Sequence, residues 1–411
     1  MKPRLFYVVV VVILFLSFDD LTAQVNSKCE SKQYESSDRF EHWLHGKQIS
    51  SQQMAAVIYM IPVVVHVLHH GDPLGQGFNF SAERIINQIR TLNEDYRRKE
   101  DTPGFNTNPD GGDTRIEFVL AKRDPNGNPT DGIVRVNIDS VHIEPSKGDI
   151  ISTCTEFSYW NPDEYLNIWC LSGLQQGLLL GSSRFPLSDL EGLPKDLPDG
   201  DGVFINAFNF GSGDINTDPT YNMGRTLTHE IGHFLGLLHT FGPCGQYTDY
   251  CEDTPPAGNV TSGCPALQPI ACDGRLVMIE NYMDYSSDRC MNTFTNDQIA
   301  RMRTVLENSP RRKSLLTSPG LGVTGIPDEN FSISIYPNPV ADKLYIALDD
   351  NMVGENIHVS VHSLLGELIL DLNFTASMNT IELPASNIQE KAIIVSVVNK
   401  KSIVRKLILK R

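Results

Sequence analysis

Apolar residues in the longer, N-terminal part of the chain alternate between strand-like and helix-like patterns. Residues 61–68 are almost wholly apolar and largely β-branched, which predicts a buried strand. After Ser81, a typical helix N-cap residue, apolar side chains recur three and four positions apart, which predicts an amphipathic helix. Strands and helices that alternate in this way predict an α+β domain with a mixed sheet. Further strands are predicted at 115–123, 165–171 and 202–207, and a strongly apolar helix at 226–237.

The pattern changes after about residue 312. Residues 318–328 are rich in Gly, Pro and Thr and have no apolar period, so we place a linker at 315–330. From there to the end, over 331–411, short alternating segments separated by turn residues predict a small all-β sandwich. Its strands are predicted at 333–336, 343–348, 357–363, 367–373, 380–383, 392–398 and 403–409.

The beginning of the chain has the pattern of a secretory signal peptide. Lys2 and Arg4 precede an unbroken apolar run at 5–16, and a small-residue cleavage site ends at Ala23. A membrane anchor is the alternative, but the run is shorter than the roughly 20 residues that a spanning helix needs. We therefore predict export with removal of residues 1–23, and no stable transmembrane segment.

Net charge and cysteine content limit the possible binding partners and the roles of the cysteines. The net charge of −16 argues against nucleic acid, because a phosphate-binding surface needs clustered Lys and Arg. The chain has eight cysteines, and in an exported protein an even set favours disulfides. No CxxC pair is present, which disfavours a cysteine zinc site. Five clustered cysteines are the disulfide candidates: Cys244, Cys251, Cys264, Cys272 and Cys290.

The segment HEIGHFLGLLH, from His229 to His239, has the spacing of a metal site. Residues four apart share one face of a helix, so the imidazoles of His229 and His233 are expected to converge on one ion. Gly236 permits the left-handed conformation that ends a helix, which lets the chain turn and bring in His239. Three imidazoles leave a fourth position for water, as a catalytic Zn²⁺ requires, and Glu230 is placed to take a proton from that water.

A buried amphipathic helix with structural histidines is the alternative, but five specified positions match by chance in such a chain only about once in 10,000. The motif resembles that of the metzincin metalloproteases, and the surrounding segments resemble the pappalysin family in particular. The resemblance covers roughly residues 60–310 and implies a metzincin-like catalytic domain at 57–314. The matching segments are 61–66, 123–132, 165–169, 221–240, 253–255 and 291–295.

The same resemblance implies roles for residues downstream of the motif. Met283 would form the methionine turn, a hydrophobic base beneath the zinc ligands, and Tyr285 would donate its hydroxyl to the developing oxyanion. Ordinary core packing and a surface aromatic are the respective alternatives. The loop after Met283 lines the pocket for the residue that follows the scissile bond in such enzymes. Asp288 and Arg289 favour opposite charges there, so selectivity stays open.

The loop at 244–253 carries acidic residues and is followed by Thr254. Oxygen ligands in a disulfide-pinned loop suit calcium, and pappalysin-like enzymes hold Ca²⁺ in this loop. The resemblance therefore implies a calcium site at Asp249, Asp253 and Thr254, with a solvated acidic loop as the alternative. It also implies a Cys264–Cys290 bridge and a bridge from Cys272 to Cys244 or Cys251, the remaining one being available to Cys154 or Cys170.

Residues 24–56 are polar, have a weak helical stripe, and are expected to form a pro-segment. In related proenzymes a cysteine near the position of Cys29 coordinates the zinc until the segment is cut away. The resemblance implies the same latency switch here, although Glu30 replaces the usual glycine. A disulfide from Cys29 is the alternative.

Residues 335–344, IYPNPVADKL, resemble the start of the C-terminal sorting domain of the type IX (Por) secretion system of Bacteroidetes. Residues 364–367 and 406–411 fit the same pattern, whereas residues 391–393 replace the usual Gly-x-Tyr. This resemblance implies the type IX machinery as a partner and a secreted or cell-surface location. A sandwich module that binds carbohydrate or protein is the alternative.

These patterns together predict a secreted zinc-dependent endopeptidase that hydrolyses protein or peptide substrates by Glu-assisted attack of zinc-bound water. One alternative is a surface adhesin that keeps the fold without catalysis. The presence of Glu230 and of all three histidines disfavours it. The other alternative is a zinc hydrolase of a non-peptide amide, which a substrate assay separates.

Overall fold

The computed structural model describes two folded parts, a large domain and a C-terminal domain. The predicted signal peptide at 1–23 lies outside the described residues, as does most of the segment at 24–56. The described residues are Cys29, 38–47, 57–140, 150–172, 179–187, 200–211, 219–321, 333–348, Gly354, 356–363, 368–375, 380–386, 388–398 and 403–410.

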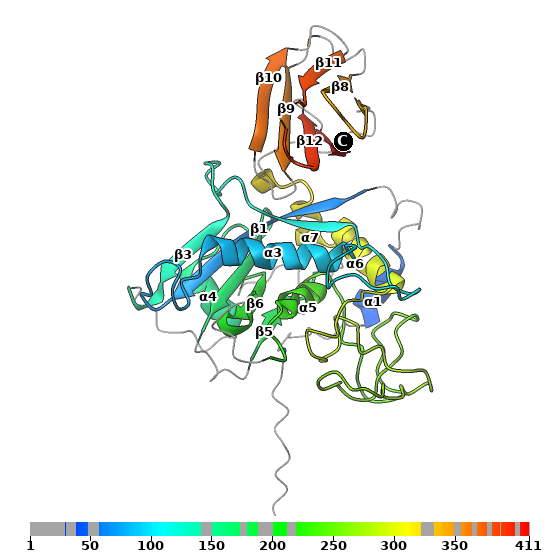
Figure 1. The fold of residues 1–411 in the computed structure, drawn as a ribbon. Helices are drawn as coiled ribbons and strands as arrows, with labels where there is room; N and C mark the ends of the chain where they lie inside the picture. The colour runs from blue at the N-terminus through cyan, green and yellow to red at the C-terminus, as the bar shows by residue number, and fades with distance from the viewer. Residues whose placement is uncertain are drawn as a thin grey trace, which may run out of the picture.

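Within the described part of the large domain, a six-stranded mixed sheet forms the centre (Figure 1). The strand order is β2-β1-β4-β6-β5, and β3 also pairs with β1. All pairs are parallel except β5 with β6, which is antiparallel. Strand β1 is buried along most of its length, the environment that favours continuous β-branched runs. The bounds are β1 (Tyr59–His69), β2 (Ile116–Leu120), β3 (Ile133–Asn137), β4 (Leu166–Leu171), β5 (Gly181–Ser183) and β6 (Val203–Asn206).

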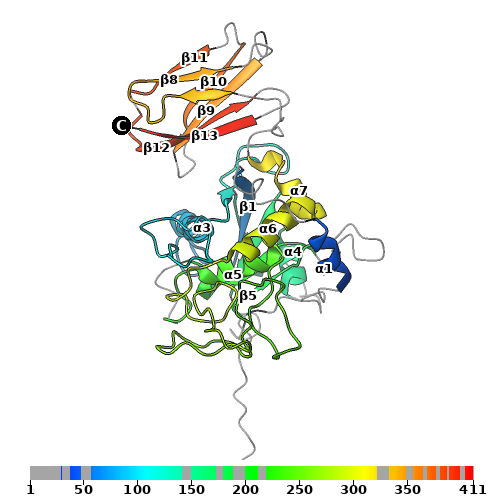
Figure 2. The same cartoon turned by 90° about the vertical axis from the view of Figure 1, so that its right-hand side faces the viewer.

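Helices cover both faces of this sheet (Figures 1 and 2). On one face, α3 and α5 pack with α6 against the inward side chains of β1, β2 and β4. On the other face, α4 packs against Leu68, Trp169 and Phe204. The mixed sheet and the apolar helix are as predicted. The helices are α1 (Asp38–His45), α3 (Ala82–Tyr96), α4 (Ile150–Phe157), α5 (Arg225–Phe234), α6 (Asn296–Asn308) and α7 (Pro310–Leu315), with 3₁₀ turns η1 (Ile138–Ser140), η3 (Ala207–Asn209) and η4 (Pro319–Leu321).

The large domain extends beyond the boundary that the sequence suggested. Leu315 is fully buried at the end of α7, and the Ser318 hydroxyl donates to the carbonyl of Glu164. The backbone N–H of Lys122 donates to the carbonyl of Gly320 over 2.7 Å. The linker predicted at 315–330 therefore does not begin at 315, because its first residues pack on the large domain as far as η4. Residues 322–330 lie outside the described residues.

The C-terminal domain is the predicted small sandwich. Its described residues form a four-stranded sheet, β10-β9-β12-β13, and a three-stranded sheet, β11-β8-β7, around a shared apolar core. In both views this domain lies on the side of α7, away from the loops at 240–290 (Figures 1 and 2). The strands are β7 (Ser334–Tyr336), β8 (Lys343–Ala347), β9 (Asn356–Ser363), β10 (Leu368–Thr375), β11 (Thr380–Pro384), β12 (Ala392–Val398) and β13 (Ile403–Leu409).

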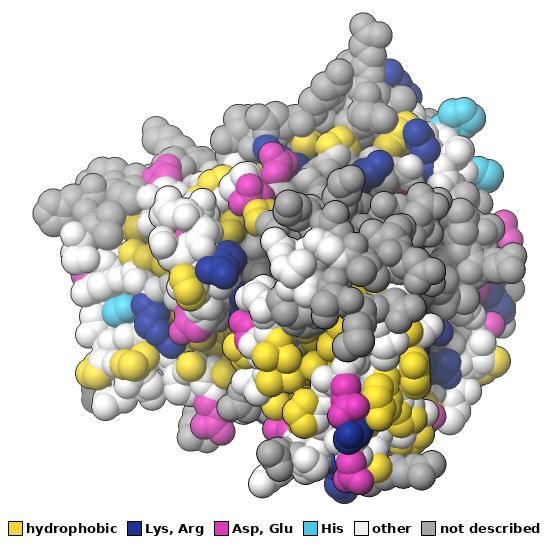
Figure 3. Space-filling model, turned by 90° about the horizontal axis from the view of Figure 1, so that it is seen from above, with side chains coloured by type: hydrophobic (Ala, Val, Ile, Leu, Met, Phe, Trp, Pro, Cys, Tyr) yellow, Lys and Arg dark blue, Asp and Glu magenta, His cyan; other side chains and the backbone are white. Residues whose placement is uncertain are grey.

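Seen from the side of the C-terminal domain, the surface has a mixed character. Acidic, basic and apolar side chains are interspersed among the described residues of this face, and they form no continuous basic patch (Figure 3). Within the described residues, no helix combines the length and apolar character needed to cross a bilayer.

Candidate metal centre

Helix α5 ends in a hydrogen-bonding pattern that determines where the next residues go. Gly236 follows the helix with φ +94°, and its N–H donates to the carbonyl of His233 over 2.9 Å. The N–H of Leu237 donates to the carbonyl of Gly232, also over 2.9 Å. These two bonds form a Schellman motif, which satisfies the last carbonyls of the helix and reverses the chain. The helix therefore stops at Phe234, earlier than predicted, and His239 is brought back over it.

The three motif histidines point their Nε2 atoms at one position. His233 Nε2 lies 3.2 Å from His229 Nε2 and 3.0 Å from His239 Nε2. Two imidazoles bound tetrahedrally to zinc at its usual bond length would have nitrogens about 3.3 Å apart. The sequence-predicted ligands thus lie together at close to the spacing that one ion requires.

The opposite ring nitrogens indicate the tautomers of two of these histidines. His229 Nδ1 lies 2.7 Å from the carbonyl of Tyr282, and His233 Nδ1 lies 2.8 Å from the carbonyl of Leu237. Carbonyls only accept, so each Nδ1 carries the hydrogen and each Nε2 presents a lone pair to the shared position. Burial lowers the pKa of His233 to about 4, so its ring is neutral, as metal ligation requires. Two lone pairs that face each other at this distance repel unless a cation lies between them. The arrangement of these residues therefore suits a zinc ion.

Cys29 completes this group from a distant part of the chain. Its Sγ and the ligand atoms of the three histidines all lie within 4.8 Å of one another. The backbone of Cys29 forms a parallel bridge with Gly181, at the start of the edge strand β5. Cysteine sulfur and histidine nitrogen are both ligands in tetrahedral zinc sites, so the described residues could supply all four ligands of a zinc ion.

Glu230 is fully buried beside this group. Its Oε2 lies 3.3 Å from Cys29 Sγ. A side chain at position 181 has no room, because a Cβ there would lie 2.5 Å from Glu230 Cγ. Because Gly181 has no side chain, the Glu230 side chain fits beside β5, where its carboxylate contacts Cys29.

Tyr285 also lies at the histidine group. Its ring centroid is 5.0 Å from that of His239 and 5.6 Å from that of His229, and its hydroxyl donates to the carbonyl of Cys29 over 3.4 Å. Burial, and then the neighbouring Cys29 and Glu230, raise the pKa of Tyr285, so the hydroxyl keeps its proton. The phenol is consequently a hydrogen-bond donor beside the histidine group.

Met283 lies beneath α5, fully buried. A Cβ on Gly232 would lie 2.5 Å from Met283 Sδ, so the glycine is what allows this close packing. The turn is held by Asn281, whose Oδ1 accepts from the N–H of Met283 over 2.9 Å and whose side-chain amide pairs with that of Gln298. The sulfur packs against the helix at Gly232.

Helix α3 supports α5 from behind through residues that the sequence patterns did not indicate. Asp95 accepts from the Thr228 hydroxyl over 2.8 Å and from Arg225 Nη2 over 3.3 Å, and Gln88 donates to the carbonyl of Gly224 over 3.0 Å. Burial raises the pKa of Asp95 to about 6, against the opposing effect of Arg225. These long-range polar pairs hold the helix that carries the histidines against α3. No local sequence pattern predicts them.

Asp288 points inward and Arg289 outward. Asp288 Oδ2 accepts from the N–H of Met223 over 2.8 Å and from the N–H of Arg225 over 3.2 Å, at the beginning of α5. Arg289 is exposed, with Nε 3.2 Å from Cys264 Sγ. The inward residue of this loop is therefore acidic and caps the helix.

Two disulfides are present among the described residues. Cys244 is bonded to Cys272, and Cys264 to Cys290. Of the two alternatives for Cys272, the structure thus has Cys244. Cys251, which was also a disulfide candidate, forms no disulfide and is buried. Cys154 and Cys170 lie in the sheet region, in α4 and β4, rather than in the loop that holds Cys251.

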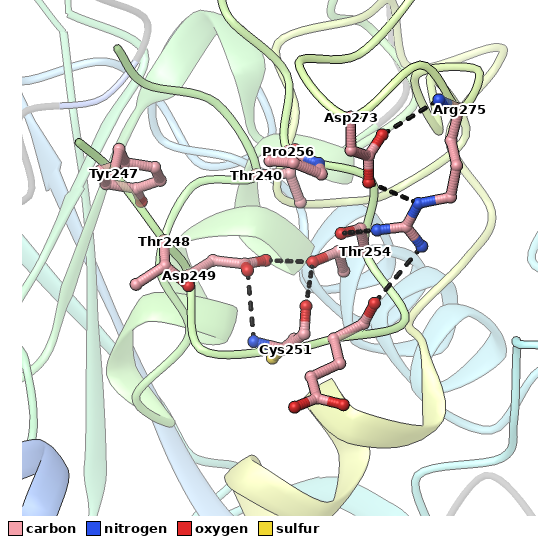
Figure 4. A pocket seen from close by; sticks show the side chains of 10 residues that line it. Thr240, Tyr247, Thr248, Asp249, Cys251, Thr254, Pro256, Asp273 and Arg275 are labelled. Carbon is pink, nitrogen blue, oxygen red and sulfur yellow. Dashed lines mark hydrogen bonds and ion pairs between the residues drawn. The ribbon is translucent and has the colours of Figure 1, made fainter. Parts of the chain in front are cut away.

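The acidic loop surrounds a cavity of about 180 Å³ (Figure 4). Asp249 lines it and accepts from the Thr254 hydroxyl over 2.6 Å. Burial raises the pKa of Asp249 to about 6. Asp253 instead accepts from the N–H of Asp297 over 2.8 Å, at the beginning of α6. The structure thus brings Asp249 and Thr254 together, whereas Asp253 bonds to a different element.

Two family profiles match this chain. The family profile described as pregnancy-associated plasma protein-A, peptidase family M43, matches residues 150–307. The profile of the secretion system C-terminal sorting domain matches residues 334–410. The first match includes α5 with its histidines, and the second covers the described part of the sandwich.

Curated relatives include extracellular metalloproteases. One from Arthroderma gypseum is 32% identical over 245 residues, which are 59% of this chain and 71% of that protein. Extracellular metalloprotease 1 of Coccidioides posadasii is 41% identical over 141 residues, which are 34% of this chain. This second alignment spans about half, 49%, of the relative's own length.

Solved structures extend the likeness over most of the large domain. A point mutant of promirolysin from Tannerella forsythia is 33% identical with a TM-score of 0.59, over 70% of this chain and 97% of that one. Mature mirolysin of Tannerella forsythia, in complex with a cleaved peptide, is 37% identical with a TM-score of 0.53, over 64% of this chain and 96% of that one.

Proposed function

Because the chain belongs to the pappalysin (M43) family of metallopeptidases, we propose that it is a zinc-dependent endopeptidase of the metzincin type. The observation that carries the proposal is the convergence of three histidine Nε2 atoms beside a buried carboxylate. His229, His233 and His239 would hold the zinc. The peptide in the mature mirolysin structure supports peptide substrates for the shared fold.

Zinc held there would supply a Lewis acid that acidifies a water molecule and polarises the substrate carbonyl. Glu230 is the general base: its carboxylate takes a proton from the attacking water as the oxygen forms a bond to the carbonyl carbon. Glu230 then gives that proton to the amine nitrogen as the C–N bond breaks. Its complete burial beside the histidines supports this role, because a low dielectric strengthens the hydrogen bond between the carboxylate and the attacking water.

Tyr285 is the oxyanion donor in this proposal. Its protonated hydroxyl and its place against the rings of His229 and His239 suit a donor that meets negative charge as it develops. Met283 contributes by packing, since its thioether fills the space beneath α5 that Gly232 leaves open.

The segment at 24–56 is a pro-segment that keeps the enzyme latent. Cys29 Sγ lies among the histidine ligand atoms and against Glu230, where it would take the fourth ligand position and hold the base. A thiolate binds zinc more strongly than water does, so removal of the segment is required for turnover.

The C-terminal domain is a secretion-system sorting domain, and the protein is exported to the cell surface or beyond. Its partner for this step is the type IX secretion machinery. Calcium is a structural ion in the proposal, with Asp249 and Thr254 as ligands in the cavity and Asp253 as the less well placed candidate.

A peptide-library digest tests the activity. The zinc-loaded enzyme, freed of residues 24–56, should cut internal peptide bonds, and the products identify the preferred side chains on each side. Cleavage only of non-peptide amides would favour the other kind of zinc hydrolase, and intact substrates of both kinds would favour the adhesin.

A further inference from the structure

Helix α1 occupies an apolar groove on the large domain. Both views place it beside α6, which lies far from α1 in the sequence (Figures 1 and 2). Three of its apolar side chains are buried there, although the helix has only eight residues. They form one cluster with three residues of the large domain, the full set being Phe40, Trp43, Leu44, Phe185, Leu238 and Val305.

An ion pair lies within this apolar contact. Arg301 on α6 donates from Nη1 and Nη2 to both oxygens of Glu41, over 2.5 and 2.7 Å. The side chains are 7% and 8% exposed, so water screens them little. A bidentate arginine–carboxylate pair in such a place specifies geometry, and loss of one partner leaves the other charge buried and unpaired.

The same arginine holds the turn that carries the third histidine. Arg301 Nε donates to the carbonyl of Gly236 over 2.6 Å. Val305, one helical turn further along α6, packs on the glycine so closely that a Cβ there would lie 2.8 Å from its Cγ2. The groove for α1 is therefore built on the segment between His233 and His239, but it uses no ligand atom of the histidines.

From this separation we infer that the groove formed by Phe185, Leu238, Arg301 and Val305 is a second binding site for the N-terminal segment, independent of the metal. Its ligand is an amphipathic helix with a carboxylate between aromatic and aliphatic side chains, here residues 38–45 of the same chain. The inference rests on the proposed function only in that it names this contact as part of latency.

Cys29 and α1 belong to one short segment of the chain, so each contact strengthens the binding of the other. With α1 bound, Cys29 stays at a high effective concentration near the histidines and returns after each dissociation. Conversely, loss of the Cys29 contact leaves α1 in its groove. Release of the whole N-terminal segment then requires α1 to leave as well, and a cut that leaves residues 38–47 attached to the large domain does not expose the groove.

Hydrogen exchange of residues 38–47 tests the inference without any turnover. The full chain is used in the Glu230→Ala background, so that the segment is not cut, and Cys29→Ser is added to break the metal contact. The α1 amides should remain protected in Cys29→Ser. Adding Glu41→Gln should speed their exchange by about tenfold or more, because Arg301 loses its charged partner.

His42→Gln is the matched control, since His42 lies next to Glu41 and is exposed on the same helix. It should leave the protection of α1 unchanged. Leu44→Ala, which removes apolar contact instead of charge, should act in the same direction as Glu41→Gln.

Loss of α1 protection in Cys29→Ser alone would overturn the inference, and so would equal exchange in Glu41→Gln and His42→Gln. Neither result depends on peptidase activity. A failure of the proposed enzyme function is therefore distinguishable from a failure of this second site.

Discussion

Cys29 Sγ lies 3.3 Å from Glu230 Oε2, although 201 positions separate the two residues in the chain. One sulfur thus meets both components of the proposed chemistry, the histidine ligand atoms and the general base. The parallel bridge to Gly181 places the backbone of Cys29 beside the edge strand β5. In the proposed mechanism this contact makes the described structure a latent form, and activity requires its removal.

Cys29→Ser should weaken latency in the uncut protein. A serine hydroxyl is a poor zinc ligand, so the fourth position becomes available to water while the segment stays attached. The measurement is peptidase activity of the uncut chain, with size checked by electrophoresis before and after the assay. Latency equal to that of the parent protein, or a mapped disulfide from Cys29, would remove the cysteine from this role.

Tyr285→Phe should lower kcat by roughly ten- to a thousandfold in the activated enzyme and change KM little, because the hydroxyl acts on charge that develops in the transition state. The ring contacts with His229 and His239 remain in the variant, so the two enzymes differ in the hydroxyl and not in the packing of the ring. Equal kcat values for the two enzymes would show that Tyr285 has only a packing role.

Gly181→Ala should impair the base rather than the metal site. The added Cβ would lie 2.5 Å from Glu230 Cγ, closer than real Cβ contacts come, so the carboxylate must move. A displacement of about 1 Å at a general base lowers the rate on the order of a hundredfold. Zinc content should be unchanged, and unchanged kcat would mean that Glu230 accommodates the methyl group.

Truncation of the C-terminal domain should separate export from catalysis. A chain that ends at Leu321 keeps α7, Ser318 and Gly320 on the large domain, and should cleave peptides like the longer chain. A chain that ends at Ser314 loses the fully buried Leu315 and should be less stable by about 2–5 kcal/mol.

In the native host, both truncated chains should stay inside the outer membrane. Chemical denaturation, a peptide assay and cell fractionation give the three readouts. Normal secretion without residues 334–410 would contradict the sorting role. Normal folding of the Leu321 form with lost activity would indicate that the sandwich helps to bind substrate.

Local pattern accounts for much of the site. The spacing of His229 and His233 places both rings on one face of α5, and Gly236 predicts the turn that returns His239. The buried strands follow from their β-branched runs. In the C-terminal domain, period-two alternation between turn residues gives strands at the predicted places.

Other parts of the site have no local signal. Strand β5, which pairs with Cys29, is short and lacks apolar alternation. The pairs Glu41–Arg301 and Asp95–Thr228 join residues 260 and 133 positions apart, so only the assembled fold brings them together. The packing of Leu315, Ser318 and Gly320 on the large domain was hidden by a Gly- and Pro-rich composition that equally suits a linker.

The most direct test of the account measures zinc content and peptide hydrolysis together, in Glu230→Ala and in the parent enzyme, both freed of residues 24–56. The ligands remain in the variant and only the base is removed. We predict equal zinc content and a rate lower by a factor of about 10²–10⁴, the range of a general base. A chelator should abolish the parent activity, and added zinc should restore it. Substantial hydrolysis by the zinc-loaded Glu230→Ala enzyme would contradict the mechanism, and full parent activity without zinc would contradict the metal site.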